Sequence, residues 1–257
     1  MTTDLFFEIV DRTDTGLVRR ANEDAVAVHL PLGLVLIADG MGGAAAGEVA
    51  SQLAVEGVFQ YLVSHSAGAK PSAATDERLL QQAVRAANRS IRRMAREYQD
   101  FRGMGTTVVA GLLRPHRLSY AHVGDSRLYR LREGRFECLT RDHSLMQEVL
   151  DDGVFSSMTE AREAGISENV LTRALGTDPS VETDVATTPI EQGDMFLFCT
   201  DGLYNMLDER LLQAEMEEGR DDLDQLADRL LELACYKGGG DNVTLVLVRR
   251  LHWDTRG

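Results

Sequence analysis

The sequence has little cysteine, and its cysteines have no regular spacing. Only three occur among 257 residues: Cys138, Cys199 and Cys235. They are odd in number, far apart and without C-x-x-C spacing, which disfavours a disulfide framework and a thiolate metal site. Each has apolar neighbours in the sequence. We therefore expect buried, reduced thiols and a cytoplasmic location.

The sequence also lacks a long apolar run. The longest strongly apolar stretch lies near Leu34–Ala38, far short of the roughly 20 residues that a membrane-spanning helix needs. The first ten residues contain Asp4 and Glu8 and no basic leader, so we expect no secretory signal. We expect no membrane insertion.

Positive charge is the third deficit. Lys and Arg number 27 against 41 Asp and Glu, which gives a net charge of −14. Such a charge repels a phosphodiester backbone, so the composition disfavours general nucleic-acid binding. The nearest approach to a basic run, Arg89–Arg96, alternates with apolar residues as one helix face would. With 44% hydrophobic and 26% charged residues, the chain is globular in composition, which excludes wholesale disorder.

Apolar residues of helical period predict three helices, over Gly47–Leu62, Leu80–Tyr98 and Leu223–Ala234. Thr75 or Asp76 is expected to cap the second of these, and Asp221 and Asp222 suit the positive N-terminal end of the third. The stretch Ser64–Thr75 is rich in Ser, Ala, Gly and Pro, which predicts a loop between the first two helices.

Shorter apolar segments predict strands over Phe6–Arg12, Ala25–Leu30, Gly33–Ala38, Thr106–Leu113, Leu118–Val123, Arg127–Leu131, Val181–Thr187, Met195–Thr200 and Asn242–Arg249. The short links His29–Gly33 and Leu131–Arg135 predict hairpins. Because the strands come in groups and do not alternate regularly with helices, we predict antiparallel sheets covered by helical layers. Between Asp142 and Pro179 the pattern weakens into short helix-like pieces, Leu145–Leu150 and Thr159–Ala164. This stretch is either a mobile surface subdomain or irregular packing.

Several aspartates stand at strand ends beside glycine. Asp39 and Asp201 each follow an apolar strand and precede a glycine, Asp125 follows Gly124, and Asp241 follows three glycines. A strand fixes where its terminal carboxylate points, and glycine allows a close approach. One Asp-Gly pair alone is more often a turn than a site. The prediction of a site therefore depends on all four acids meeting in space.

If these carboxylates lie close together, their negative charge must be balanced. Each close pair would repel by roughly 4 kcal/mol at an effective dielectric of about 20. Divalent cations relieve this repulsion, and oxygen ligands without a Cys/His cluster favour magnesium or manganese over zinc. The main-chain carbonyl of Gly40 can add a ligand. An arginine of Thr13–Asp24 that is held near such a metal cluster can grip a phosphate with its planar fork, although Arg20 is interpreted as a solvated loop charge.

Motifs occur along nearly the whole chain, in the segments Gly16–Asp24, Ala38–Gly43, Gly103–Thr107, Val123–Arg127, Asp142–Ser144, Leu171–Gly176, Thr200–Leu203 and Gly240–Thr244. In this order they resemble the metal-dependent type 2C Ser/Thr protein phosphatases, the PPM family, in their compact bacterial form. The resemblance implies an α+β fold, a four-layer α-β-β-α sandwich with two central antiparallel sheets. It implies a single domain over residues 1–257, with a flap subdomain at about 142–179.

The resemblance also implies roles for particular residues. Asp39 would bridge two manganese or magnesium ions, with the Gly40 carbonyl on one ion and Asp201 and Asp241 on the other. Asp125, with Asp201, resembles a weaker third metal site. The implied roles outside the metal ligands are water orientation by Glu23 and Asp24 and phosphate binding by Arg19.

The implied activity is hydrolysis of phosphoserine and phosphothreonine on proteins, opposing a Ser/Thr kinase, by a monomer that binds no nucleic acid. Met41 stands where some eukaryotic members carry a histidine proposed as general acid, which leaves the proton donor open; a water at the third metal site is one candidate. His122 lies within an apolar strand, and His143 is expected to support structure near the flap.

Two alternatives stay open, a catalytically silent phosphoprotein-binding module and a hydrolase of small phosphoesters. Neither Cys138 nor Cys199 lies in a phosphate-binding cysteine loop, which disfavours a cysteine-dependent phosphatase.

Overall fold

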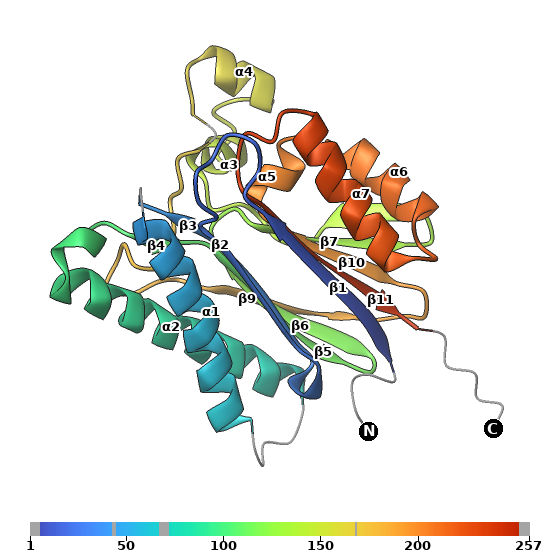
Figure 1. The fold of residues 1–257 in the computed structure, drawn as a ribbon, viewed down its shortest axis with the longest axis horizontal. Helices are drawn as coiled ribbons and strands as arrows, with labels where there is room; N and C mark the ends of the chain where they lie inside the picture. The colour runs from blue at the N-terminus through green and yellow to red at the C-terminus, as the bar shows by residue number, and fades with distance from the viewer. Residues whose placement is uncertain (1–5, 43–44, 67–71, 168, 252–257) are drawn as a thin grey trace.

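Two antiparallel sheets face each other at the centre of the molecule (Figure 1). The computed structural model describes residues 6–42, 45–66, 72–167 and 169–251. The first sheet has the order β1 (Phe7–Asp14), β11 (Val243–Arg250), β10 (Met195–Cys199), β7 (Arg127–Arg132) and β8 (Arg135–Cys138). The second has the order β2 (Asp24–His29), β3 (Leu34–Met41), β5 (Val108–Arg114), β6 (Arg117–Val123) and β9 (Asp184–Pro189), and β4 (Gly105–Thr106) pairs with β3.

Helices cover the outer face of each sheet (Figure 1). The second sheet is covered by α1 (Ala45–His65) and α2 (Ala73–Glu97), and the first by α5 (Asp201–Tyr204), α6 (Glu209–Glu218) and α7 (Leu223–Tyr236). The short helices α3 (Leu145–Asp151) and α4 (Met158–Glu163) stand beyond one end of the sheets, and two 3-10 turns cover Leu30–Leu32 and Gln99–Phe101. These layers confirm the predicted four-layer α-β-β-α sandwich. None of the helices in the described ranges is both long and apolar enough to cross a membrane.

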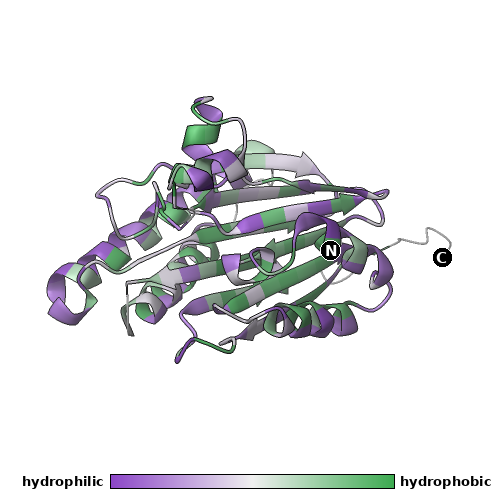
Figure 2. Cartoon of the chain, turned by 90° about the horizontal axis from the view of Figure 1, so that it is seen from above, coloured by the Kyte–Doolittle hydropathy of each residue, from purple (hydrophilic) through white to green (hydrophobic). Residues whose placement is uncertain are grey.

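The strand period explains why there are three apolar layers. Successive side chains of a strand point to opposite faces of its sheet. In β3, Leu36 packs toward α1 and α2 while Ile37 packs between the sheets. In β10, Leu197 faces the α5–α7 layer and Phe198 faces the other sheet. Figure 2 shows the same division, with apolar strands inside and polar residues on the outer faces of the helices.

Most predicted elements are present with shifted ends, and both predicted hairpins are confirmed. The predicted strand Val181–Thr187 begins only at Asp184, and neither Thr200 nor Asn242 belongs to a strand. No range was predicted for the edge strand β8, which forms the second arm of the Leu131–Arg135 hairpin, and helices α5 and α6 were not predicted. Helices α1 and α2 enter the predicted loop Ser64–Thr75 from both sides, and its residues 67–71 lie outside the described ranges, as does Gly43 of the Ala38–Gly43 motif.

The predicted cap of α2 was wrong. Ser72 is the N-cap residue, and its side chain accepts a hydrogen bond from the backbone N–H of Thr75. Asp76 is instead buried, where it receives hydrogen bonds from the guanidinium groups of Arg114 and Arg117. These partners are distant in sequence, so the local pattern did not reveal them.

The prediction of three buried thiols was right for one cysteine only. Cys199 is buried in β10, whereas Cys138 is exposed on the edge strand β8 and Cys235 is half-buried near the end of α7. All three are free thiols. Apolar sequence neighbours do not bury a residue on an edge strand, where one side has no neighbouring strand.

Candidate active site

The strand registers bring the predicted acids to one end of both sheets. Asp24 opens β2 and lies opposite Asp39 near the end of β3. Val108 at the start of β5 lies opposite Val123 at the end of β6, so Asp125 follows at the same end. In the other sheet, Cys199 lies opposite Leu245 of β11. This pairing brings together Asp201 and Asp241, just after β10 and just before β11, and both line one cavity with Asp39 and Asp125.

These residues surround a cavity of about 290 Å³. Its walls include Asp39, Gly40, Asp125, Asp201, Asp241, Glu23 and Arg19. Asp24 is not among the lining residues: it is 8% exposed, and its Oδ2 accepts a hydrogen bond of 2.9 Å from Oγ1 of Thr200. The cavity therefore gathers every predicted site residue except Asp24, while the individual roles of these residues stay predictions.

The cavity carries an excess of negative charge. Burial raises the pKa of Asp39 well above its ordinary value, and the neighbouring charges of Asp24 and Asp201 raise it further. Burial, followed by the charge of Asp201, raises the pKa of Asp125 to about 7. Arg19 is the one basic residue lining the cavity in the described part of the chain, and its Nη2 donates a hydrogen bond of 2.6 Å to Oδ2 of Asp241.

Two buried carboxylate oxygens show that the residues fit a cation. Oδ1 of Asp24 and Oδ1 of Asp201 are buried and have no hydrogen-bond partner among the described residues. A buried polar atom without a partner is rare and indicates an ion or water at that position. The donors around the cavity are carboxylate and main-chain oxygens, which suit magnesium or manganese.

Backbone hydrogen bonds hold Asp39 from the neighbouring motifs. The backbone N–H of Asp39 donates to Oγ1 of Thr107 at 2.9 Å, and its carbonyl accepts from the N–H of Thr107 and from Oγ1 of Thr106. Oγ1 of Thr107 lies 2.6 Å from Oγ of Ser126. The Gly103–Thr107 and Val123–Arg127 motifs therefore position the end of β3.

Asn242 positions the acidic loop in the same way. Its Nδ2 donates to the carbonyls of Thr15 and Ala21, and its Oδ1 accepts from the backbone N–H of Glu23 at 2.8 Å. Sequence reasoning assigned no role to Asn242 or to the two threonines before β5. Their places in the Gly240–Thr244 and Gly103–Thr107 motifs were the available signal.

Glycines allow the close approach of β3 and α1. A Cβ at Gly40 would lie 2.1 Å from the carbonyl oxygen of Gly47, and one at Gly47 would lie 2.6 Å from Oε2 of Glu23. Both distances are shorter than van der Waals contact. Glycine at both positions therefore brings the start of α1 against the cavity.

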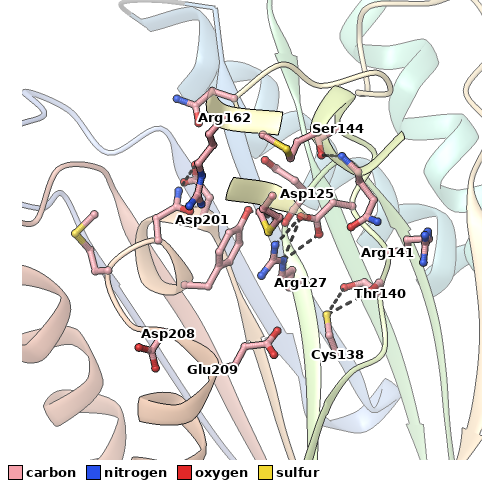
Figure 3. A pocket seen from close by; sticks show the side chains of 18 residues that line it. Asp125, Arg127, Cys138, Thr140, Arg141, Ser144, Arg162, Asp201, Asp208 and Glu209 are labelled. Carbon is pink, nitrogen blue, oxygen red and sulfur yellow. Dashed lines mark hydrogen bonds and ion pairs between the residues drawn. The ribbon is translucent and has the colours of Figure 1, made fainter. Parts of the chain in front are cut away.

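A larger cavity of about 900 Å³ adjoins the first and shares Asp125 and Asp201 with it (Figure 3). It lies between the α3–α4 segment and the start of α6. Arg127 on its wall donates to both oxygens of Asp142, and its guanidinium carbon lies 3.8 Å from the ring centre of Tyr204. The hydroxyl of Tyr204 donates to the carbonyl of Asp125. These contacts join Asp125 to the segment after β8.

The segment at 142–179 borders the small cavity. Its predicted helical pieces are present as α3 and α4. Leu171, which pairs with Ser144, lines the cavity, and Leu175 pairs with Thr106. His143 supports this region as expected, because its Nδ1 accepts from the backbone N–H of Gly124 and its carbonyl accepts from that of Thr172.

A second group of potential metal ligands lies apart from the predicted one. Ligand atoms of His122, His143 and Asp184 lie within 4.8 Å of one another. Arg173 donates to Oδ1 of Asp184 at 3.0 Å, and its Nη1 lies 3.4 Å from Nε2 of His143. This guanidinium already supplies a cation to the group, so we do not assign a metal to it.

Comparison with known proteins decides the family. A family model described as Protein phosphatase 2C matches residues 18–232. This chain belongs to the protein phosphatase 2C family. It is 38% identical over 251 residues to the Serine/threonine phosphatase stp of Listeria innocua serovar 6a, which covers 93% of this chain and 94% of that protein.

Solved structures of the family share the fold. The crystal structure of the Mycobacterium tuberculosis serine/threonine phosphatase PstP/Ppp matches with a TM-score of 0.85 and 35% identity, and the match covers 96% of this chain and 100% of that one. The catalytic domain of PstP in complex with 2 manganese ions matches with a TM-score of 0.83 and 34% identity, over 96% of this chain and 99% of that one. The phosphatase 2C fold and the acid-lined cavity thus occur together in this chain.

Proposed function

We propose that this protein is a metal-dependent protein phosphatase that hydrolyses phosphoserine and phosphothreonine on protein substrates. The observation that carries this proposal is the cavity in which Asp39, Asp125, Asp201 and Asp241 meet beside Arg19. Membership of the phosphatase 2C family supports the same reaction. No thiol is needed, since none of the three cysteines lines this cavity in the described chain.

Two manganese or magnesium ions are the proposed cofactors, by analogy with the PstP structure that contains manganese. Asp39 and the Gly40 carbonyl would hold them together with Asp201 and Asp241, and Asp125 with Asp201 would hold a weaker third ion. When bound, such ions supply Lewis acidity, which lowers the pKa of water and neutralises charge on phosphoryl oxygens. The unpartnered Oδ1 of Asp201 supports its place in this set.

The other residues of the cavity orient the reactants. Arg19 can present two parallel N–H groups to a phosphate, and its side chain is 50% exposed at the cavity mouth. Glu23 and Asp24 are proposed to accept hydrogen bonds from water beside the acids. The backbone N–H of Glu23 is fixed by Asn242, so the loop carrying Arg19 and Glu23 is held near Asp241.

The proton for the leaving serine or threonine oxygen comes from water in this proposal. Met41 lines the cavity, and a thioether has no proton to donate. The cavity walls contain no histidine in the described residues. We place the donor water in the part of the cavity formed by Asp125 and Asp201.

The wider setting is also part of the proposal. Residues 1–257 would form a single domain, with residues 142–179 as a flap beside the cavity. The enzyme would act as a monomer, oppose a cognate Ser/Thr kinase, and act on that kinase and its targets. We propose a cytoplasmic location because all three cysteines are free thiols, as a reducing compartment favours.

Metal-dependent turnover tests this function. A chromogenic phosphomonoester and a phosphothreonine peptide are each assayed with added Mn²⁺ and with EDTA. We expect both to be hydrolysed with Mn²⁺ and neither in EDTA. Full activity in the chelator would contradict the metal mechanism. Binding of the peptide without turnover would identify a silent binding module, and turnover of the small ester alone would identify a small-phosphoester hydrolase.

A further inference from the structure

Helix α2 carries a concentrated basic surface on this acidic chain. Arg89, Arg92, Arg93 and Arg96, here called the arginine patch, line a groove of about 370 Å³ with Glu97 and Pro179. Their spacing of i, i+3, i+4 and i+7 puts all four on one helix face. The net charge of the chain is −14, so this positive surface is an exception to its composition.

Helix stability does not explain the patch. Like charges three or four residues apart repel each other along a helix. Arg89, Arg93 and Arg96 are exposed, and no ion pair to an acidic residue is found for them in the described chain. A basic residue in the last turn of a helix interacts favourably with the helix dipole. This interaction explains a basic residue at position 96 but not at position 89.

The patch is connected to the edge of the active-site cavity. Met41 pairs with Gly105, and the next residue, Thr106, pairs with Leu175. The chain then runs from Leu175 past α2, where Nη1 of Arg92 donates to the carbonyl of Thr177 at 2.6 Å. Asn88 holds the same stretch, since its Oδ1 accepts from the N–H of Gly176 at 2.7 Å. Leu175 itself is buried, but residues 177–179 are exposed, and the segment that lines the cavity at Leu171 also lines the groove at Pro179. A substrate segment that leaves the cavity beside Leu171 can therefore extend over the exposed residues 177–179 to the arginine patch.

We propose that the arginine patch binds an acidic or additionally phosphorylated segment of the phosphoprotein substrate. This inference rests on the proposed function, because the segment is connected to the phosphoresidue in the cavity. Guanidinium groups match carboxylate and phosphate oxygens with paired hydrogen bonds. From Arg89 to Arg96 the helix rises roughly 10 Å, the length of about three extended residues. This length suits a short peptide better than the broad surface of a membrane or a duplex, and the acidic remainder of the chain repels both.

The test compares substrates of matched sequence. A phosphothreonine peptide with flanking Asp and Glu residues is set against the same peptide with Asn and Gln, and a chromogenic phosphomonoester serves as a substrate without flanks. The test variant is R89Q/R93Q/R96Q, which leaves the Arg92 hydrogen bond intact. The control R135Q/R210Q/R220Q removes the same charge from exposed positions on the opposite side of the sandwich.

We expect the wild-type enzyme to show a KM about fivefold lower for the acidic peptide, a preference that weakens as salt increases. The test variant should lose this preference with kcat unchanged, and the control should keep it. Equal KM values for both peptides in the wild type would overturn the inference. So would a preference that survives in the test variant, or an effect of the variant confined to anionic vesicles or DNA. If the wild-type enzyme does not hydrolyse the phosphomonoester, the proposed function itself is refuted. The melting temperature of each variant shows whether it is folded.

Discussion

Arg19 and Asp241 form an ion pair across the mouth of the cavity, with Nη2 of the arginine 2.6 Å from Oδ2 of the aspartate. They are 222 residues apart in the chain. Their side chains are 50% and 35% exposed, so the pair contributes little to stability. The pairing does fix the guanidinium beside the acids, where a substrate phosphate would be bound.

Replacement of Arg19 by alanine tests its role in phosphate binding. We expect the KM for phosphopeptides to rise about tenfold, the loss of roughly 1.4 kcal/mol of binding, with a smaller change in kcat. The physical reason is loss of a charge-assisted hydrogen-bonding fork. Steady-state kinetics on one phosphopeptide give both constants. Arg20→Ala is the matched control because Arg20 is exposed and adjacent. An unchanged KM in Arg19→Ala would remove the assigned role.

Asp39→Asn and Asp201→Asn test the proposed metal ligands. Each change keeps the side-chain volume and removes a negative oxygen, so we expect kcat to fall by about 10²-fold or more while the fold is kept. In metal-free protein the variants should melt at or above the wild-type temperature, because a neutral amide avoids the cost of burying an ionisable acid among other acids. Asp221→Asn, at an exposed position, is the control. Wild-type turnover in either variant would count decisively against this ligand set.

The pH dependence of metal-free stability follows from the raised pKa values. Burial and neighbouring charge raise the pKa of Asp125 to about 7, and they also raise those of Asp39 and Asp201. The folded chain then holds protons that the unfolded chain releases above about pH 4. These groups therefore contribute stability fully below the unfolded pKa and lose it as the pH rises through the folded one.

In EDTA, the melting temperature should fall between pH 5.5 and pH 7.5 by more in the wild type than in Asp39→Asn. Added Mn²⁺ neutralises the ionised acids, so the increase in melting temperature that it produces should be larger at pH 7.5. Thermal melts followed by circular dichroism at both pH values measure these changes. An Mn²⁺-induced increase that is larger at pH 5.5 would show that the acids are not the groups involved.

The convergence of the acids could be predicted because strand ends carry it. Asp39 follows a buried apolar strand, and antiparallel pairing puts its partner residue Asp24 at the same end. The family motifs then indicated that Asp125, Asp201 and Asp241 belong to the same site. What the sequence could not show is which polar residues hold the backbone there. The Asn242 side chain hydrogen-bonds to backbone groups of Thr15, Ala21 and Glu23 at once, and only the folded chain brings these groups together.

Errors in the prediction share the same cause. Asp76 looked like a helix cap because local pattern favours acids in a first turn, yet Arg114 and Arg117 from the neighbouring strands bind it. Cys138 looked buried because its neighbours are apolar, yet β8 is an edge strand. Helix α6 escaped notice because its buried face contains Glu215 among the apolar residues. In each case the position of the residue in the folded chain, and not its neighbours in the sequence, decided the outcome.

The Arg127–Asp142 pair makes the strongest prediction about stability. Nε and Nη2 of Arg127 donate to the two Asp142 oxygens at 3.0 and 2.7 Å, and the side chains are only 19% and 13% exposed. Arg127→Met leaves a poorly solvated carboxylate without its partner, so we expect a loss of about 3 kcal/mol in the free energy of unfolding. Urea denaturation in EDTA measures this loss without a contribution from metal binding.

The double variant Arg127→Met/Asp142→Asn separates pairing from packing. Removal of the orphaned charge should restore part of the stability, since a neutral amide is less costly to bury than an unpaired carboxylate. Arg132→Met is the comparison variant. Arg132 lies at the opposite end of β7 from Arg127 and donates hydrogen bonds to Asp194. This variant should destabilise the fold without lowering kcat, whereas Arg127→Met should lower kcat, because Arg127 packs on Tyr204, which holds the carbonyl of Asp125. Equal kcat values in the two variants would show that the Arg127 contacts do not position Asp125.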